Sequence, residues 1–487
     1  MVSPRQRFAR ELWTLADLEA AASARRSFRS RAYRQAVWSL DDVPPDLDAP
    51  AEELLAVPGI GEGVVGLIRD FRESGSIQRL EELRSGLPVA AAELRRLPRM
   101  NPDMLRKLKT QLEVETVADL EAALETGAVE TVPGVGPSTV AVWLDRIERE
   151  LALAGIPIPR ALSFGLQLRD HVTRHVPGVE LAVSGAVARL DDRVDAIELA
   201  GSPEETGRFL ATSALVCDYE PGTARFLTLG GAVVIRSPAE ELPVAGVTVE
   251  DLRGDMHRHS EWSPDGHDSI ASIVDGAIRR GLEYVAITDH AVDLAFGGLS
   301  PDDLARQQDE IEALARDRPG FLILQGAELN IGRDGSVDYS DDILERLDFR
   351  LAAVHSYFDL PEPEQTERVL AAIHCPRIHA IGHLTGRRIG YRPPIRLDMR
   401  PVLEAAAATS TALEVNGHID RLDLSAEFIP LAADLGAVFI ANSDAHRHRE
   451  WGNLANAVTV LRKAGVAPDQ VVNTWPVERL QRWLARS

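Results

Sequence analysis

From residue 250 onward, short apolar segments of strand length alternate with longer stretches in which apolar residues recur at helical spacing. Seven such strand–helix units predict a parallel sheet that curves into a barrel. The predicted strands are GDMHRH (254–259), YVAITDH (284–290), FLILQGAE (321–328), FRLAAVHS (349–356), IHAIGH (378–383), ALEVN (412–416) and VFIANSDAH (438–446).

The pattern before residue 250 is different. Residues 1–150 favour short amphipathic helices, with Pro44 and Pro45 ending the first group. A short α/β segment follows, with strands expected at LAVSGAVARL (181–190), DAIELA (195–200), ARFLTL (224–229) and GAVVIRS (231–237), and then a linker, SPAEELPVAG (237–246). We therefore expect four regions: a helical small domain (1–49), a second helical region (50–150), the α/β segment (151–245) and the barrel (250–487).

Two related glycine patterns stand in the second helical region, LLAVPGIGEGVVGLI (54–68) and VETVPGVGPSTVAVWL (129–144). Glycine permits a tight turn whose amides approach a phosphate, and the N-terminus of the following helix favours negative charge. One such pattern alone would favour a plain turn between packed helices, but two matching copies favour a binding motif. A third stretch, LRRLPRMNPDMLRKL (94–108), has the rhythm without the glycines, so we expect its hairpin to be structural or degenerate.

These patterns resemble the helix-hairpin-helix motif, which binds the DNA backbone without reading sequence. The resemblance implies that Gly59, Gly61, Gly134 and Gly136 lie at DNA-binding turns.

Composition limits the classes of function. The 487 residues carry a net charge of −22, which argues against a surface that coats DNA generally. Residues 1–110, however, hold 18 Lys and Arg against 16 Asp and Glu, so the excess acid lies further along the chain. Two cysteines, no apolar run of membrane-spanning length and no signal-peptide core in MVSPRQRFARELW lead us to expect a cytoplasmic protein without a membrane partner.

Histidine is the most unevenly distributed residue. None of the 13 histidines occurs in residues 1–170, and 11 occur after residue 250. Most of these stand at predicted strand ends, and in a parallel βα barrel the C-terminal strand ends converge on one rim. Imidazole together with carboxylate suits Zn²⁺, Mn²⁺ or Fe²⁺, and a site with several ions activates water and clamps phosphoryl oxygens. The pattern therefore predicts a metal-dependent phosphoric ester hydrolase with two or three divalent ions.

The motif series GDMHRHSEWSPDG, ITDHA, GAELN, AVHSYF, IGHLTGRR, LEVN and NSDAH resembles that of the PHP (polymerase and histidinol phosphatase) superfamily. The resemblance implies a distorted seven-stranded βα barrel with a trinuclear centre in which Glu328 bridges two ions. It implies catalytic roles for His257, His259, Glu328, Asp444 and His446. The full ligand set that it implies is His257, His259, Asp265, His290, Glu328, His355, His383, Asp444 and His446.

Two points depart from this pattern or stay open. The family's Ser-Asp-Gly is one residue longer here, Ser263-Pro264-Asp265-Gly266, so either Asp265 or His267 is the ligand. Arg387, Arg388 and Arg421 follow polar strand ends and are candidates to hold substrate phosphate, with solvated surface arginines as the alternative.

The order of parts resembles bacterial family X DNA polymerases, which carry helix-hairpin-helix motifs, a nucleotidyltransferase palm and a PHP domain. FRSRAYRQAV also resembles their N-terminal small domain. In the palm stretch LAVSGAVARLDDRVDAIELA, Ser184-Gly185 stands where the family has Gly-Ser, and Asp195 matches the first of three metal-binding carboxylates. Ile197 and Val234 replace the other two, so we expect polymerase activity to be lost, unless Asp192 or Glu198 compensates in a shifted register.

We therefore expect a Mn²⁺-dependent 3′-5′ exonuclease or end-processing enzyme of DNA repair that contacts the backbone at DNA 3′ ends. The alternatives are a small-molecule phosphatase of the histidinol-phosphate type, a residual family X polymerase and a non-catalytic DNA-binding adaptor. We make no prediction about protein partners.

Overall fold

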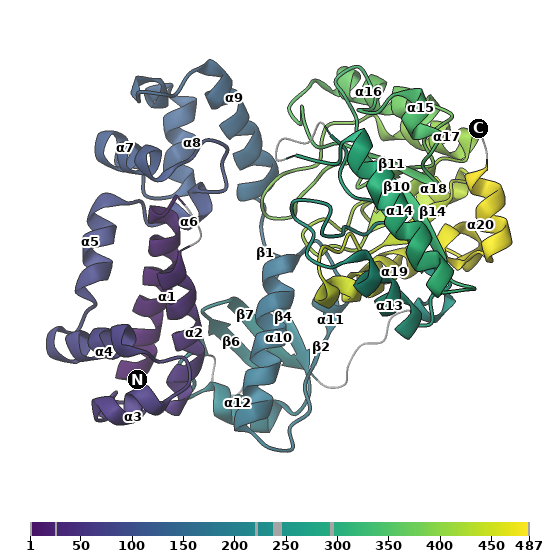
Figure 1. The fold of residues 1–487 in the computed structure, drawn as a ribbon. Helices are drawn as coiled ribbons and strands as arrows, with labels where there is room; N and C mark the ends of the chain where they lie inside the picture. Colours follow the sequence, from purple (N-terminus) through teal and green to yellow (C-terminus); the bar gives the residue numbers. More distant parts are fainter. Residues whose placement is uncertain (1, 25–26, 220–222, 237–245, 293–296, 486–487) are drawn as a thin grey trace. The chain divides into compact units, whose positions relative to one another are not determined.

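A computed structural model describes residues 2–24, 27–219, 223–236, 246–292 and 297–485. The chain divides into two compact units, residues 1–240 with 390–392, and residues 241–389 with 393–487 (Figure 1). The first unit holds the helical regions and the short α/β segment, and the second holds the predicted barrel. The expected linker (237–246) lies, apart from Gly246, outside the described residues.

The second unit is built on a seven-stranded sheet in the order β14-β13-β12-β11-β10-β9-β8, with every neighbouring pair parallel. An isolated parallel bridge between Arg258 and Ala445 links the two edges, so the barrel is nearly closed. This confirms the predicted α/β fold class. The strands are β8 (Gly254–Asp255), β9 (Tyr284–Ile287), β10 (Leu322–Asn330), β11 (Phe349–Ala353), β12 (Ala380–Gly382), β13 (Ala412–Asn416) and β14 (Phe439–Asn442).

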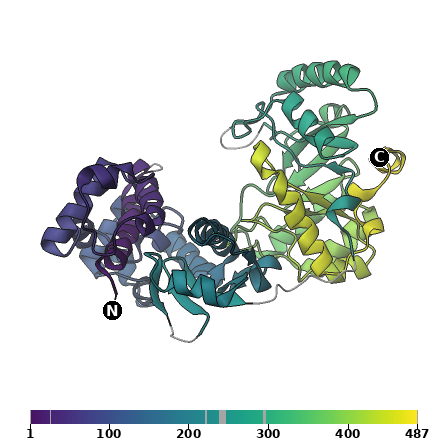
Figure 2. The same cartoon turned by 90° about the horizontal axis from the view of Figure 1, so that it is seen from below.

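The strands are continuous apolar runs because the sheet is covered on both faces. Inside the barrel, Tyr284, Phe349 and Ile440 belong to one buried cluster, which Leu480 and Trp483 of the last helix complete. Helices pack around the outside of the sheet (Figures 1 and 2). They are α13 (Ile270–Arg279), α14 (Pro301–Asp317), α15 (Asp341–Leu344), α16 (Glu362–His374), α17 (Met399–Thr409), α18 (Ile429–Asp434), α19 (Asn453–Lys463) and α20 (Val477–Leu484).

The first 150 residues are helical, as expected, and turns of the same type recur between the helices. The helices are α1 (Pro4–Ala22), α2 (Phe28–Ser39), α3 (Ala51–Ala56), α4 (Glu62–Ser74), α5 (Gln78–Gly86), α6 (Ala91–Leu94), α7 (Pro102–Leu112), α8 (Val117–Glu125) and α9 (Pro137–Arg146).

The two predicted glycine hairpins have the same backbone. Gly59 and Gly134 have φ of 91° and 100°, in the left-handed region that favours glycine. Gly61 and Gly136 are the N-caps of α4 and α9, so the free amides of each helix start follow the turn directly. This is the local geometry in which a helix N-terminus meets an anion.

The third hairpin is not degenerate in its backbone. Arg99 has φ of 61° at the position equivalent to Gly59, and Asn101 caps α7 by accepting a hydrogen bond from the Met104 amide at 2.9 Å. Arginine and asparagine therefore support the turn that glycine supports in the other two hairpins.

The palm-like segment forms a five-stranded sheet in the order β2-β4-β7-β6-β5, packed against α10 (Ile158–His175). One expectation was wrong: LAVSGAVARL holds only the short strand β2 before a helical turn begins at Gly185. The elements are β2 (Ala182–Val183), α11 (Gly185–Ala188), β4 (Ile197–Ala200), α12 (Pro203–Leu210), β5 (Val216–Tyr219), β6 (Arg225–Thr228) and β7 (Gly231–Arg236), beside a β1 (Ile156–Pro157) and β3 (Arg193–Val194) pair.

The register of the palm also corrects the sequence alignment. Glu198 lies opposite Val234, whereas Ile197 lies opposite Val233 and is fully buried, so Ile197 and Val234 face opposite sides of the sheet. The side that faces Gly185 carries Glu198: a Cβ on Gly185 would lie 1.9 Å from the Glu198 carboxylate. Glu198 pairs with Arg236 at 3.2 Å, and Asp195 lies exposed before β4.

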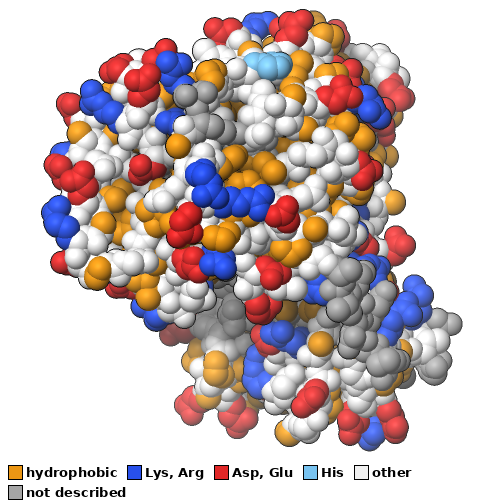
Figure 3. Space-filling view, turned by 90° about the vertical axis from the view of Figure 1, so that its right-hand side faces the viewer, with side chains coloured by type: hydrophobic (Ala, Val, Ile, Leu, Met, Phe, Trp, Pro, Cys, Tyr) orange, Lys and Arg blue, Asp and Glu red, His pale blue; other side chains and the backbone are white. Residues whose placement is uncertain are grey.

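No helix among the described residues is long and apolar enough to cross a membrane. On the face shown in Figure 3, acidic and basic side chains are interspersed.

Substituting the two glycines of the first hairpin should separate their roles. In G59A, the new Cβ would lie 2.9 Å from the Ser39 hydroxyl on a backbone with φ of 91°, whereas a Cβ on Gly61 meets nothing within 4 Å. We expect G59A to destabilise the protein by roughly 1–2 kcal/mol and G61A by less, roughly 0.5 kcal/mol, because alanine is a poorer N-cap than glycine but fits the backbone at residue 61. Thermal unfolding followed by circular dichroism measures both, and equal midpoints for the two variants would contradict this assignment.

Candidate metal centre

The strand ends of the barrel bring the candidate ligands into one cup. His257 and His259 follow β8, His290 follows β9, and Glu328 lies near the end of β10. Three of the four remaining strands supply theirs in the same way: His355 follows β11, His383 follows β12, and Asp444 and His446 follow β14. Asp265 comes from the loop between β8 and α13.

Glu328 is at the centre of this cup. It is 1% exposed, and its two carboxylate oxygens lie within 3.5 Å of imidazole nitrogens from five histidines. The distances are 3.5 Å to His257, 3.5 Å to His259, 2.9 Å to His290, 3.1 Å to His355 and 2.8 Å to His383. A carboxylate placed this way can bridge two ions.

The side chains form three overlapping groups in which all ligand atoms lie within 4.8 Å of one another. The groups are His259, Asp265, His290 and His446; His257, His259 and Asp444; and His290, Glu328 and His355. His383 lies outside these groups but contacts Glu328 directly.

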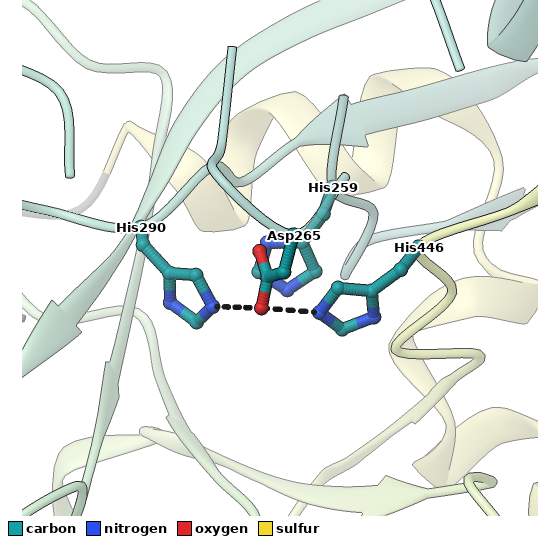
Figure 4. Close-up of side chains that lie close together, drawn as sticks. All are labelled: His259, Asp265, His290 and His446. Atoms are coloured by element: carbon teal, nitrogen blue, oxygen red, sulfur yellow. Dashed lines mark ion pairs between the residues drawn. The ribbon is translucent and has the colours of Figure 1, made fainter. Parts of the chain in front are cut away.

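Asp265, not His267, reaches the cluster. Its Oδ2 lies 3.4 Å from His290 Nε2 and 3.3 Å from His446 Nε2, between the two rings (Figure 4). His267 is exposed and contacts Arg447 at 2.7 Å.

The electrostatics of the cup fit a cation. Burial lowers the pKa of His259 to about 3 and that of His383 to about 4, which leaves both rings neutral with a lone pair to donate. Burial also lowers the pKa of His290, but Glu328 and Asp265 outweigh it and raise the value to about 10. In the metal-free protein, a proton on His290 balances the carboxylates, and a bound ion would replace it.

Several buried atoms of the cup also have unused bonding capacity. Glu328 Oε2, His355 Nε2 and Asp265 Oδ1 are buried and make no hydrogen bond with the described residues. Glu328 Oε2 and His355 Nε2 have ion-pair neighbours, but a buried polar atom that makes no hydrogen bond is costly, and a divalent cation would satisfy all three atoms. The donor set of nitrogen and oxygen atoms suits zinc, manganese or iron better than calcium.

Glu414 is the functional residue that the sequence analysis missed. It is fully buried at the middle of β13, and its carboxylate accepts from His257 Nδ1 at 2.7 Å. It also accepts from the His383 amide at 2.7 Å and from the Asn416 and Asn442 side chains at 3.1 and 2.8 Å. By receiving the Nδ1 proton, Glu414 turns the Nε2 lone pair of His257 toward the cup. The sequence does contain a sign of this role, because an acidic residue stands inside the apolar run ALEVN.

The three candidate arginines separate in the structure. Arg421 lies beside the cluster, with its Nε 3.3 Å from Asp444 Oδ2. Arg387 is 7% exposed and donates to the backbone carbonyls of Arg421 and Leu422 at 2.7 and 2.6 Å. Arg388 pairs with Asp420 at 2.9 Å near the surface. Arg421 is thus brought against a candidate ligand, while Arg387 bonds to the loop that carries Arg421.

Comparisons with known proteins follow the division of the chain. Residues 3–77 match the helix-hairpin-helix domain, residues 91–149 match the SAM-like helix-hairpin-helix tandem, and residues 255–443 match the PHP domain. The tandem match includes the third hairpin, whose turn lacks the glycines.

Two curated relatives cover different lengths. The DNA polymerase/3′-5′ exonuclease PolX of Bacillus subtilis (strain 168) is 26% identical over 94% of this chain and 96% of its own. A probable phosphatase of Syntrophotalea carbinolica is 34% identical, over 45% of this chain and 90% of its own. Among solved structures, histidinol phosphate phosphatase of Lactococcus lactis is 21% identical with a TM-score of 0.35, over 44% of this chain and 94% of that one.

The PHP match, the converging cluster and the two curated relatives identify a metal-dependent phosphoester hydrolase. The match along nearly the whole of PolX accounts for the hairpins and the palm as well. The chain therefore belongs to the family X DNA polymerase-like proteins with a C-terminal PHP domain.

Proposed function

We propose that the protein is a 3′-5′ exonuclease or end-processing enzyme that hydrolyses terminal phosphodiesters of DNA during repair. The observation that carries the proposal is the convergence of eight candidate ligands on the cup that holds the ninth, the buried Glu328 carboxylate, in a chain that also presents helix-hairpin-helix turns. The relative of matching length, PolX, bears the name of such an exonuclease.

The proposed ligands are those implied by the sequence: His257, His259, Asp265, His290, Glu328, His355, His383, Asp444 and His446. They would hold two or three divalent ions, manganese, zinc or iron. When bound, such ions supply an activated water and neutralise charge on the phosphoryl oxygens. Arg421 would hold a phosphate oxygen, since its Nη1 is buried without a hydrogen bond to the described residues and its Nε already lies beside Asp444.

The domains divide this work. Residues 1–49 and 50–150 would bind the DNA backbone, residues 151–245 would act as a scaffold, and residues 250–487 would hydrolyse the ester. We infer that the palm has lost polymerase activity. Nucleotidyl transfer needs carboxylates that hold two ions, and on the side of the sheet facing Gly185 the Glu198 carboxylate is occupied by Arg236.

A small-molecule phosphatase is the second candidate. It is favoured by the probable phosphatase of Syntrophotalea carbinolica. The match covers 90% of that protein but only 45% of this chain. It leaves the hairpins without a role, because a small phosphate ester needs no backbone-binding unit.

Nuclease activity is the first test. A 5′-labelled primer–template incubated with the protein and Mn²⁺ should give a ladder of shorter products, with or without deoxynucleotides. The double variant H257A/H259A should lose at least about 100-fold in rate, more than is expected for removing an outer partner of a ligand. Denaturing gel electrophoresis measures both.

The same assay separates the alternatives. An extended primer would contradict the loss of polymerase activity. No change of the primer with any divalent metal, together with hydrolysis of simple phosphomonoesters, would replace the exonuclease by the phosphatase.

The role of Glu414 is tested by metal affinity. E414Q removes the negative charge that receives the His257 Nδ1 proton, so we expect Mn²⁺ affinity to fall about 10- to 100-fold. Equilibrium dialysis against a chelator measures it.

D289N is the matched control for E414Q. Asp289 is also a buried carboxylate, but it accepts hydrogen bonds from Ser260 and Gln307 rather than from a candidate ligand, and burial raises its pKa to about 6. Its metal affinity should stay near that of the wild type. Equal Mn²⁺ affinities in wild type and E414Q would show that Glu414 does not support the metal centre.

The hairpin turns are tested by adding charge where the fold tolerates it. A Cβ on Gly61 or Gly136 meets nothing within 4 Å, and aspartate is a good N-cap, so G61D/G136D should fold stably. Each new carboxylate at a phosphate-binding turn should cost about 1 kcal/mol, so DNA affinity should fall roughly 30-fold. Fluorescence anisotropy at several salt concentrations measures this, with G61S/G136S as the uncharged control. Unchanged affinity in the aspartate variant would place the DNA elsewhere.

A further inference from the structure

Tyr357 is an exposed aromatic side chain beside a candidate ligand. It is 53% exposed and stands two residues after His355, on the loop between β11 and α16. Two residues of extended chain span at most about 7 Å, so Tyr357 is at the rim of the metal cup.

The backbone of Tyr357 is left-handed, with φ of 55°. This conformation is costly for an aromatic residue, and such residues gather at functional sites. Two proposed ligands of the same rim share it: His383 has φ of 24° and Asp444 has φ of 49°. Tyr357 thus shares with these two candidate ligands a backbone conformation that residues other than glycine seldom adopt.

Two buried polar side chains hold this conformation from behind. Gln365, fully buried, donates to the Tyr357 carbonyl at 2.6 Å. Arg368, 1% exposed, donates to the Ser356 carbonyl at 3.1 Å and to the Tyr357 carbonyl at 3.4 Å. Both residues come from α16, so a rigid helix fixes the loop.

The ring itself is backed by a cation. The Arg368 guanidinium carbon lies 5.7 Å from the Tyr357 ring centroid. With half of the side chain exposed, the ring contributes little to the core. A ring fixed from below and open above is suited to stacking with a planar partner.

We propose that Tyr357 stacks on the base of the 3′-terminal nucleotide whose phosphodiester lies in the metal cup. This rests on the proposed exonuclease function. A nucleobase is the planar group that accompanies a phosphodiester within one residue's reach, and stacking on an aromatic ring accepts every base. Tyr357 thus makes a phosphate-hydrolysing centre selective for nucleotide ends while leaving it indifferent to sequence.

The test combines two changes, one in the ring and one in the substrate. The variants are Y357F, which keeps the ring, and Y357L, which keeps apolar bulk without it. The substrates are an oligonucleotide with an ordinary 3′ end and one whose 3′-terminal residue is abasic. We expect Y357L to lower kcat/KM on the ordinary substrate about 5- to 150-fold and to leave the abasic substrate nearly unchanged. Y357F should behave as the wild type on both.

Binding gives a readout that does not depend on catalysis. A 3′-terminal 2-aminopurine should lose fluorescence on binding to wild type and Y357F, but not to Y357L. Y357G is a second variant, since glycine relieves the left-handed strain: it should keep the wild-type melting temperature and lose the same base dependence.

The outcomes separate two failures. If no variant, wild type included, shortens DNA, the exonuclease function fails. If the wild type shortens DNA and Y357L lowers kcat/KM by the same factor on both substrates, relative to the wild type, or quenches 2-aminopurine like the wild type, the stacking role is wrong.

Discussion

The structure of the second unit depends on one buried carboxylate surrounded by imidazoles. Glu328 is nearly inaccessible, and five histidines from four other strand ends approach its oxygens. A buried carboxylate without compensation would be strongly destabilising, and here the rings of His355, His257 and His290 outweigh burial and hold its pKa well below the usual range. Each strand end of the barrel must therefore be in register for the centre to exist.

The second layer of polar groups explains how apolar strands deliver polar side chains so accurately. Glu414 fixes His257, and Asn330 accepts from the other ring nitrogen of His355 at 2.7 Å. Each bond selects the tautomer whose remaining nitrogen faces the cup. Such groups are buried inside strands, where the fold would otherwise place hydrophobic residues.

The sequence was sufficient to predict the barrel and the convergence of the strand-end residues. Strands in which every residue is apolar, each followed by a polar residue, are typical of parallel strands whose C-terminal ends meet at one rim. It was insufficient wherever the outcome depends on pairing. Glu414 looked like part of a strand core, since nothing local shows that it faces His257. The sequence alignment of the palm did not give the strand register, because a bend between Asp195 and Ile197 shifts the alternation of side chains between the two faces of the sheet. Only the pairing of Glu198 with Val234 reveals this shift. The third hairpin was expected to be structural or degenerate, and the sequence could not decide between them because the left-handed conformation of Arg99 is uncommon for arginine.

The carboxylates of the palm-like sheet and those of the barrel are neutralised by different kinds of positive charge. In the palm, Glu198 is neutralised by Arg236, a fixed cation on the neighbouring strand. In the barrel, Glu328 and Asp444 are neutralised mainly by His257 and His290, whose pKa values are raised by the neighbouring carboxylates and which can give up their protons to a metal ion. An arginine cannot be displaced in this way, because it does not deprotonate in proteins. The barrel carboxylates, whose counter-charges are mostly exchangeable, can therefore accept a metal ion more readily than Glu198, whose counter-charge is permanent.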